Sequence, residues 1–588
     1  MTWRRGVPSG TPVHRGEPAG DGNPPGSSTA PGNRAPAGDG GAVSDPEAVP
    51  GLGAAPPGAG RLRAAIPAQA GLGATAVSIA LTLTVAILGP SVMEPALPGR
   101  PGQPPWAFAA HPSAYLAVAL TFAAIVAGSF GLAVTMRAAR LGWSVSPQVL
   151  LTTGLIAAAV LVLLPPFGSS DHLSYAAYGR MLVTGHNPYL TTPNELARLG
   201  DPIARAVEDW RTSPSVYGVL ATGGQALASL IGGTSVRLTV FVLSLLNLAG
   251  FAVTGLLLHR LAAGDRSRQL RAALLWTCNP LLLLILVAGE HVDSQAIVFG
   301  VAAVAAFALA LRRAAAGATW RCVPWAFAAG LLAGLGFAVK LSMLLVAVGL
   351  AAACLLAWSA PARPRAPGRA RAWAPAASAL AGLTAGFAAV AAAALAIGGL
   401  TSLRPALRAG SYVAIGTPWR WVRAAIGLAA GEGVADDIVK VAAAVTVLVL
   451  AWLLLRGLPR PGGAPGLDGG PWLTGPAGVD GPQAAGLAGL AALAFVLAWL
   501  TAGPYVLPWY DGLAWALLPL LPWSAIDWLV LARTTALAIG YLPARGIVMP
   551  AGLDWLVTVV RRGVTPALLL VVAVLLVVTV RTRKPAGP

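Results

Sequence analysis

Charged residues are scarce in this sequence. Asp, Glu, Lys and Arg make up 11% of its 588 residues, against roughly 25% in an ordinary soluble domain. Lysine is the scarcest charged type, with only three copies among 40 basic residues, whereas the apolar AVILMFWYC set reaches 56%. This composition excludes an ordinary water-facing globular protein.

Cysteine is also scarce. The three cysteines, Cys278, Cys322 and Cys354, lie far apart and form no CxxC pair, which excludes a disulfide framework and predicts inert core residues. Acidic residues are outnumbered, and the net charge is +18. A nucleic-acid partner would need that charge clustered on one soluble face. The arginines instead recur in small groups, so we expect no nucleic-acid partner.

Sustained apolar runs are missing only from the two ends. Residues 1–65 are rich in Gly, Pro, Ala and Ser and are expected to form a disordered cytoplasmic tail, because they cannot bury enough surface to offset ordering entropy. No short apolar stretch with a cleavage site precedes the first long run, so we expect no signal peptide. Residues 584–588 form a short tail, and residues 66–583 the main domain.

Long apolar runs recur throughout the main domain, each long enough to cross a hydrocarbon core as a helix. The sequence therefore predicts an all-α, polytopic integral membrane protein with about 13 transmembrane helices and amphipathic juxtamembrane helices in outward loops. The expected spans are 71–89, 114–136, 149–165, 237–258, 271–288, 294–311, 323–339, 341–358, 374–398, 438–455, 484–503, 512–532 and 564–580. Two further segments are ambiguous: 534–550 is short and broken, and 216–232 suits a re-entrant or interfacial helix.

The charges divide between alternate connections. One set holds 18 arginines and three acids, and the other holds 12 acids. Because cytoplasmic loops carry the excess of Lys and Arg, we expect a cytoplasmic N-terminus and an outward face that carries the acids. Two outward connections are long, 166–236 and 399–437, and loops of that length are usually functional.

The first long loop opens with a helical pattern from Asp171 to about Val183, followed by Gly185 as a C′ residue and an Asn187-Pro188 turn. Its apolar side predicts a helix lying on the membrane surface. Asp171 then stands at a helix start, where the helix dipole favours its ionised form, as a catalytic base requires. The alternative is that Asp171 is simply an N-cap.

Four more groups of residues are candidates for chemistry. Glu290, His291 and Asp293 stand between two spans. His291 and Asp293 suit a divalent metal, and the alternative is that the group forms a polar cap between helices. Lys340 between two apolar runs suits a phosphate ligand or a snorkelling lysine. In the second long loop, arginines beside indoles suit a phosphate or sugar site, or an interfacial aromatic belt: Tyr412, Trp419, Arg420, Trp421 and Arg423. Tyr505, Trp509 and Tyr510 stand at the outer end of the eleventh span.

These motifs together resemble a known family. Asp171 with Ser174-Tyr175-Ala176-Ala177-Tyr178-Gly179-Arg180-Met181, Asn187-Pro188-Tyr189, Asn279-Pro280, Glu290-His291-Val292-Asp293 and Leu507-Pro508-Trp509-Tyr510 is similar to the actinobacterial polyprenol-phosphate-mannose-dependent alpha-1,6-mannosyltransferases of the GT-C superfamily. The similarity covers roughly residues 70–580. Two positions depart from it: relatives often show His-Asn-Asp where this chain has His291-Val292-Asp293, and His172 replaces a hydrophobic or aromatic neighbour of the aspartate.

The resemblance implies a plasma-membrane enzyme that moves mannose from a polyprenyl-phosphate donor to a growing alpha-1,6-mannan on the outer face, such as a lipomannan-type glycolipid or cell-envelope glycan. Asp171 matches the family's general base for an inverting displacement. Lys340 with Arg420 or Arg423 is expected to hold the departing phosphate. The other expected substrate-binding residues are Tyr175, Tyr178, Arg180, Asn187, Tyr189, Glu290, His291, Asp293, Trp419, Trp509 and Tyr510. No cofactor and no metal site are expected.

Two alternatives stay open on the sequence. A GT-C enzyme could use another polyprenyl-phosphate sugar, such as arabinose. A polytopic lipid or solute transporter would also be all-helical with intramembrane acids, although the spans show no obvious internal repeat and the polar chemistry gathers in the loops.

Overall fold

The computed structural model describes residues 59–315, 319–359, 369–457, 481–545 and 549–582. These residues contain helices and no strand, so the all-helical prediction is confirmed over this part of the chain. The expected tails lie outside the described residues, except that the first helix, α1 (Ala59–Leu88), begins within the range predicted for the N-terminal tail. All three cysteines are buried, as predicted.

Among the described residues, nine helical segments are long and apolar enough to cross a membrane by length and composition. The longer helices are α2 (Ala114–Arg140), α3 (Pro147–Val162), α8 (Val236–Leu261), α11 (Asp293–Ala315), α12 (Thr319–Val339), α13 (Leu344–Ser359), α14 (Arg369–Gly398), α17 (Glu432–Gly457), α18 (Gly481–Ala502), α20 (Ala525–Gly540) and α21 (Thr565–Thr582). Short helical pieces follow one another from α9 (Arg266–Ala272) through η1 (Ala273–Thr277) and α10 (Pro280–Leu282) to η2 (Leu283–Ala288), and every residue from Leu270 to Ala288 is buried.

One predicted span is wrong. The sequence predicts a single helix over 512–532, but α19 (Asp511–Leu517) and a 3-10 turn (Leu518–Leu520) end there, and α20 starts after Ser524. Ser524 and Asp527 form a reciprocal capping box at the start of α20, which satisfies the free N–H groups of a new helix. The break also lies beside a buried ion pair, Arg271 to Asp527 at 2.5 Å.

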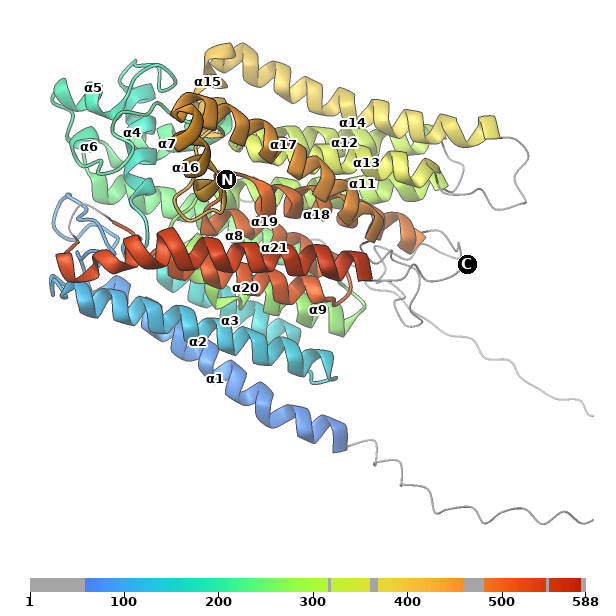
Figure 1. Cartoon of the computed structure of the whole chain (residues 1–588), viewed down its shortest axis with the longest axis horizontal. Helices are drawn as coiled ribbons and strands as arrows, with labels where there is room; N and C mark the ends of the chain where they lie inside the picture. The colour runs from blue at the N-terminus through green and yellow to red at the C-terminus, as the bar shows by residue number, and fades with distance from the viewer. Residues whose placement is uncertain (1–58, 316–318, 360–368, 458–480, 546–548, 583–588) are drawn as a thin grey trace, which may run out of the picture. The chain divides into compact units, whose positions relative to one another are not determined.

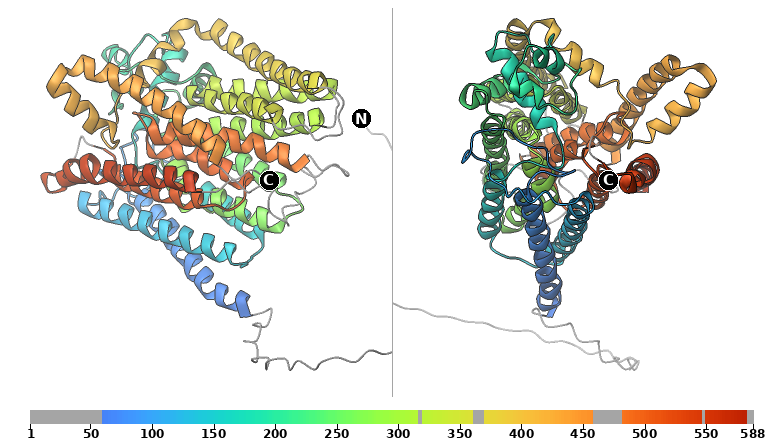
Figure 2. Two further views of the ribbon diagram at one scale, coloured as in Figure 1. Left: turned by 45° about the vertical axis from the view of Figure 1, so that its right-hand side comes forward. Right: turned by 90° about the vertical axis from the view of Figure 1, so that its left-hand side faces the viewer.

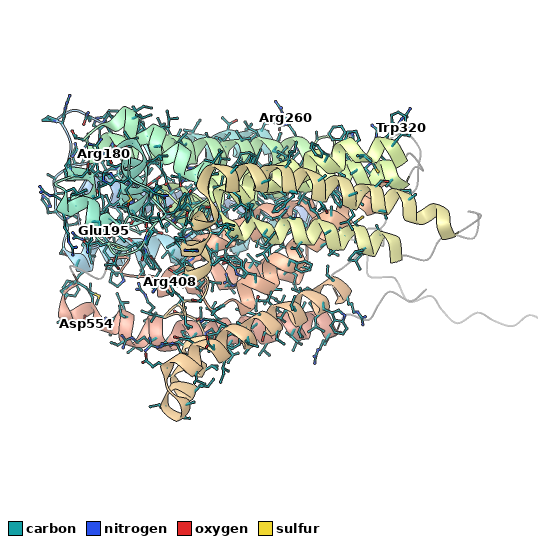
Figure 3. The ribbon with its side chains drawn as sticks, turned by 90° about the horizontal axis from the view of Figure 1, so that it is seen from above. Arg180, Glu195, Arg260, Trp320, Arg408 and Asp554 are labelled. Carbon is teal, nitrogen blue, oxygen red and sulfur yellow. The ribbon has the colours of Figure 1, made fainter. Side chains whose placement is uncertain are left out.

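The polar chemistry gathers at one end of the long helices. Figure 1 shows α4 (Asp171–Val183), α5 (Pro193–Arg198), α6 (Pro202–Arg205) and α7 (Val219–Gly232) at this end, together with α15 (Arg404–Ala409) and α16 (Trp419–Ala430). The right panel of Figure 2 faces this end and shows α4–α7 grouped on one side of the helices. In Figure 3, Arg180, Glu195 and Arg408 lie at this end and Trp320 at the opposite one.

The bounds of helix α4 agree with the prediction, but its surroundings do not. It runs from Asp171 to Val183, Gly185 follows with φ +81°, and Asn187 closes its turn by accepting a bond from the Tyr189 N–H. However, nearly every side chain of α4 is buried, so the prediction of a membrane-surface helix is wrong. Neighbouring loop helices cover the polar face that sequence periodicity assigned to water.

Gly179 sets how closely α4 approaches α7. A Cβ atom at position 179 would collide with the backbone carbonyl of Gln225. We therefore expect Gly179→Ala to destabilise the protein by about 1–3 kcal/mol and to displace α4, which carries Asp171. Thermal unfolding in detergent measures the effect. Gly223→Ala on α7 is the matched control, because a Cβ atom there meets no atom within 4 Å; equal stability of the two variants would contradict this packing.

Candidate functional site

Asp171 is the first residue of α4, and its carboxylate faces two other segments. Oδ1 accepts a hydrogen bond of 3.2 Å from the indole N–H of Trp210, and Oδ2 lies 3.7 Å from Nδ1 of His291. Ser170 is the N-cap residue and donates its hydroxyl to Asp209 instead of capping the helix. The carboxylate is thus part of a side-chain cluster, so the N-cap alternative does not describe it.

Burial decides the proton affinity of this carboxylate. Desolvation, together with the nearby charge of Asp209, raises the pKa of Asp171 to about 7, although Lys340 and the Trp210 bond act in the opposite direction. The helix start was expected to favour the ionised form, but the loss of water outweighs that dipole. A carboxylate with a pKa near 7 is a suitable general base at neutral pH.

Trp210 reaches Asp171 from a loop 39 residues later in the chain. Its backbone φ is +58°, a left-handed conformation that is rare for a bulky residue and that is typical of functional sites. No local pattern in the sequence marks this contact. The distance along the chain is why sequence reasoning missed Trp210.

Lys340 is the cation of the site. Its ammonium donates to both carboxylate oxygens of Asp293 at 2.7 Å and lies 4.1 Å above the ring of Tyr510. The side chain is mostly buried, so the snorkelling alternative is wrong. Two of its three N–H donors bind Asp293, which leaves the third for a ligand.

His291 lies beside Asp171 and packs against an aromatic side chain. Its ring stacks on Trp509 with centroids 3.6 Å apart and an interplanar angle of 11°. Burial lowers the pKa of His291 well below its ordinary value, so the imidazole is neutral. Glu290, the preceding residue, is buried with φ +52°, and desolvation, together with the nearby charge of Asp171, raises the pKa of its carboxyl group well above its ordinary value.

A cavity of about 360 Å³ opens beside these groups. Six residues predicted from the sequence line it: Asp171, Tyr175, Tyr178, Lys340, Trp509 and Tyr510. Tyr505, which the sequence placed beside Trp509 and Tyr510 without a binding role, also lines it. Sequence reasoning did not assign the other aromatic and uncharged polar lining residues to the site: Ser174, Trp210, Ser213, Tyr217, Ser342 and Trp499. Leucines and a valine of residues 341–348 form one apolar side of the cavity. The cavity therefore joins a carboxylate, an ammonium group, aromatic rings and an apolar wall.

Three predicted residues of the first loop do not line the cavity but hold that loop together. Arg180 forms a 2.7 Å ion pair with Asp201, and the Tyr189 hydroxyl bonds Thr222 at 3.0 Å. Asn187 closes the turn before Tyr189. Their contacts indicate structural roles.

The expected phosphate ligands of the second loop also lie off the cavity lining. Arg423 pairs with Asp436 at 2.5 Å, and the indole N–H of Trp419 donates to the carbonyl of Ala502 at 2.7 Å. Desolvation lowers the pKa of Arg420, and the nearby positive charge of Arg562 lowers it further. The expectation that Arg420 or Arg423 shares the phosphate with Lys340 is not supported by this geometry. The amphipathic helix α16 holds these residues at the protein's edge.

The part of the chain that the structure describes contains no group of three or more His, Cys, Asp or Glu side chains placed to hold a metal ion. His291 and Asp293, the two residues weighed as metal ligands, contact Asp171 and Lys340 respectively. Asp293 accepts hydrogen bonds from the Lys340 ammonium, whereas the His291 Nδ1 lies beside Asp171 beyond hydrogen-bond distance.

Comparisons with known proteins agree on one family. Residues 70–367, just over half of the chain, match the family model described as alpha-(1->6)-mannopyranosyltransferase, N-terminal domain. The chain is 28% identical over 134 residues to alpha-(1->6)-mannopyranosyltransferase A of Corynebacterium glutamicum and 32% identical over 152 residues to alpha-(1->6)-mannopyranosyltransferase B of the same organism. It is 33% identical over 142 residues to a probable alpha-(1->6)-mannopyranosyltransferase of Mycolicibacterium smegmatis.

These alignments are partial. They cover 23%, 26% and 24% of this chain and 27%, 25% and 25% of the three relatives, so the chain matches about a quarter of the length of each. No solved structure matches the chain significantly. The segment matched by the family model contains Asp171, His291, Asp293 and Lys340, but the aromatic lining from residues 499–510 lies beyond it.

Proposed function

We propose that this chain, which belongs to the alpha-(1->6)-mannopyranosyltransferase family, transfers mannose from a polyprenyl-phosphate donor to an alpha-1,6-linked mannan. The observation that carries the proposal is the placement of Asp171 and Lys340 on one cavity that also has an apolar wall. The family favours glycosyl transfer over the transporter alternative.

The reaction we propose is a single displacement with inversion. The Asp171 carboxylate removes the proton from an acceptor hydroxyl while that oxygen attacks the anomeric carbon of the donor sugar. The bond from that carbon to the phosphate oxygen breaks as the new glycosidic bond forms. The proton stays on Asp171, and the polyprenyl phosphate leaves with the bonding electrons. Lys340 supplies the positive charge that the departing phosphate needs, and the proposal includes no resident cofactor.

The apolar wall suits the lipid part of such a donor. Leu344 and Val348 lie on α13, one to two turns beyond Lys340, and both side chains are partly exposed at the surface of the helices. A prenyl chain placed there would remain among apolar groups while its phosphate reached the ammonium of Lys340. This arrangement supports a lipid-linked donor over a water-soluble sugar nucleotide.

We also propose that the site faces outward from the plasma membrane. The acids of α4–α6 and the following loop gather at the end that carries the cavity, whereas the arginine-rich connections, such as the one between α8 and α9, belong to the other set of loops. Short cytoplasmic loops retain the excess of Lys and Arg. Labelling of an engineered surface cysteine in loop 166–236 of intact cells tests this orientation.

Transfer should depend on pH through Asp171. Because the base acts as the carboxylate and its pKa is raised to about 7, kcat/KM should fall about tenfold per pH unit below pH 7 and level off above it. Initial rates with acceptor well below KM, measured between pH 5.5 and 8.5, give kcat/KM at each pH. A flat profile across that range would contradict the assignment of Asp171 as the base.

The direct test of the proposed function uses the purified full chain in lipid nanodiscs. Polyprenyl-phosphate mannose and an alpha-1,6-linked mannobiose are supplied, and mass spectrometry detects the trisaccharide. Polyprenyl-phosphate arabinose in a parallel reaction tests the alternative sugar. Extension with mannose alone is the expected result, and extension with arabinose alone would overturn the choice of sugar.

A further inference from the structure

A row of three aromatic side chains leads away from Asp171. Trp210 donates to the carboxylate, and its ring meets that of Tyr505 edge-on, with centroids 6.5 Å apart at 80°. Tyr505 meets Tyr412 in the same way, at 6.2 Å and 75°. The three rings come from three separate connections along the chain, before α7, after α15 and after α18.

The side chains at both ends of this row are partly exposed to solvent. Trp210 is 40% exposed and Tyr412 is 37% exposed. Tyr505, between them, lines the cavity together with Ala409 and Gly410. The row therefore runs from the reacting carboxylate to the surface at the end of the molecule that carries α15 and α16.

The chemistry of these rings matches one class of ligand. The flat faces of pyranose rings consist of C–H groups, which pack on the electron-rich face of an aromatic ring. A saccharide stacked on Trp210 would have a hydroxyl next to Asp171, because the indole is bonded to that carboxylate. The apolar wall on α13 consists of other lining residues, and these suit the lipid.

We propose that Trp210, Tyr505 and Tyr412 form a binding track for the acceptor glycan, with Trp210 under the sugar that reacts and Tyr412 under a sugar further along the chain. This proposal rests on the proposed function, because it assumes a saccharide acceptor. It predicts that long acceptors bind more tightly than short ones, because only long acceptors reach Tyr412.

The test compares alpha-1,6-linked mannobiose with mannohexaose. Tyr412→Ala should raise KM for mannohexaose about tenfold and leave kcat and the KM for mannobiose unchanged. Tyr115→Ala is the matched control, since Tyr115 is an exposed tyrosine on α2 that does not line the cavity. An unchanged KM for mannohexaose, or an equal rise for both acceptors, would overturn the outer position of the track.

Binding without turnover separates this proposal from the proposed function. Isothermal titration of mannohexaose into the full chain requires no donor, and Tyr412→Ala should weaken binding by the same factor. Asp171→Asn should bind mannohexaose normally while failing to transfer mannose. If that variant transfers mannose yet Tyr412→Ala still weakens binding, the base assignment fails and the track stands. If Tyr412→Ala binds mannohexaose normally, the track is wrong, and the proposed function is not affected.

Discussion

Asp171→Asn should reduce mannosyl transfer by at least about 10³-fold while leaving the protein folded. The substitution keeps the size of the side chain and its ability to accept the Trp210 indole N–H, but it removes the only group placed to take a proton from the acceptor in this proposal. Initial rates of mannobiose extension measure the loss. The buried carboxylate is costly to keep charged, so the amide should not lower stability.

The matched control for this variant is Asp201→Asn. Asp201 also belongs to the first long loop, where it caps α6 and pairs with Arg180, but it does not line the cavity. Its amide still caps the helix, so transfer should remain close to wild type. Full activity of Asp171→Asn would rule out Asp171 as the base, and equal losses in both variants would indicate a structural effect of the loop.

Lys340→Met should show the second-largest effect, on both transfer and stability. The substitution removes the cation expected at the departing phosphate, which should lower kcat about 10²–10³-fold. It also leaves the buried Asp293 carboxylate without its two 2.7 Å bonds. Removing one partner of a buried ion pair destabilises a protein by about 3–5 kcal/mol. Transfer rates and thermal unfolding measure the two effects separately.

The double variant Lys340→Met with Asp293→Asn separates the two roles of the lysine. It removes the unpaired charge, so most of the lost stability should return while transfer stays low. Lys340→Arg keeps a positive charge and should retain more activity than Lys340→Met. Wild-type transfer by the double variant would show that the ammonium of Lys340 has no part in stabilising the phosphate.

Sequence reasoning worked where the signal was local. The length of the apolar runs predicted an all-helical chain, and turn and capping residues predicted the bounds of α4 and the turn at Asn187. It failed for the span 512–532 because apolar composition is continuous across a break that is set by the capping box at Ser524. It also failed for the surroundings of α4, because periodicity describes one helix and not the segments that cover it.

The sequence by itself determined the class of the molecule, the end of it that carries acidic loops, and Asp171, Tyr175, Tyr178, Lys340, Trp509 and Tyr510 as members of one site. Only the tertiary structure decided which groups each of them contacts. It paired Lys340 with Asp293, placed His291 and Trp210 against Asp171, and kept Arg420 and Arg423 off the cavity. The physical reason is that burial and the pairing of charges depend on contacts between segments tens to hundreds of residues apart.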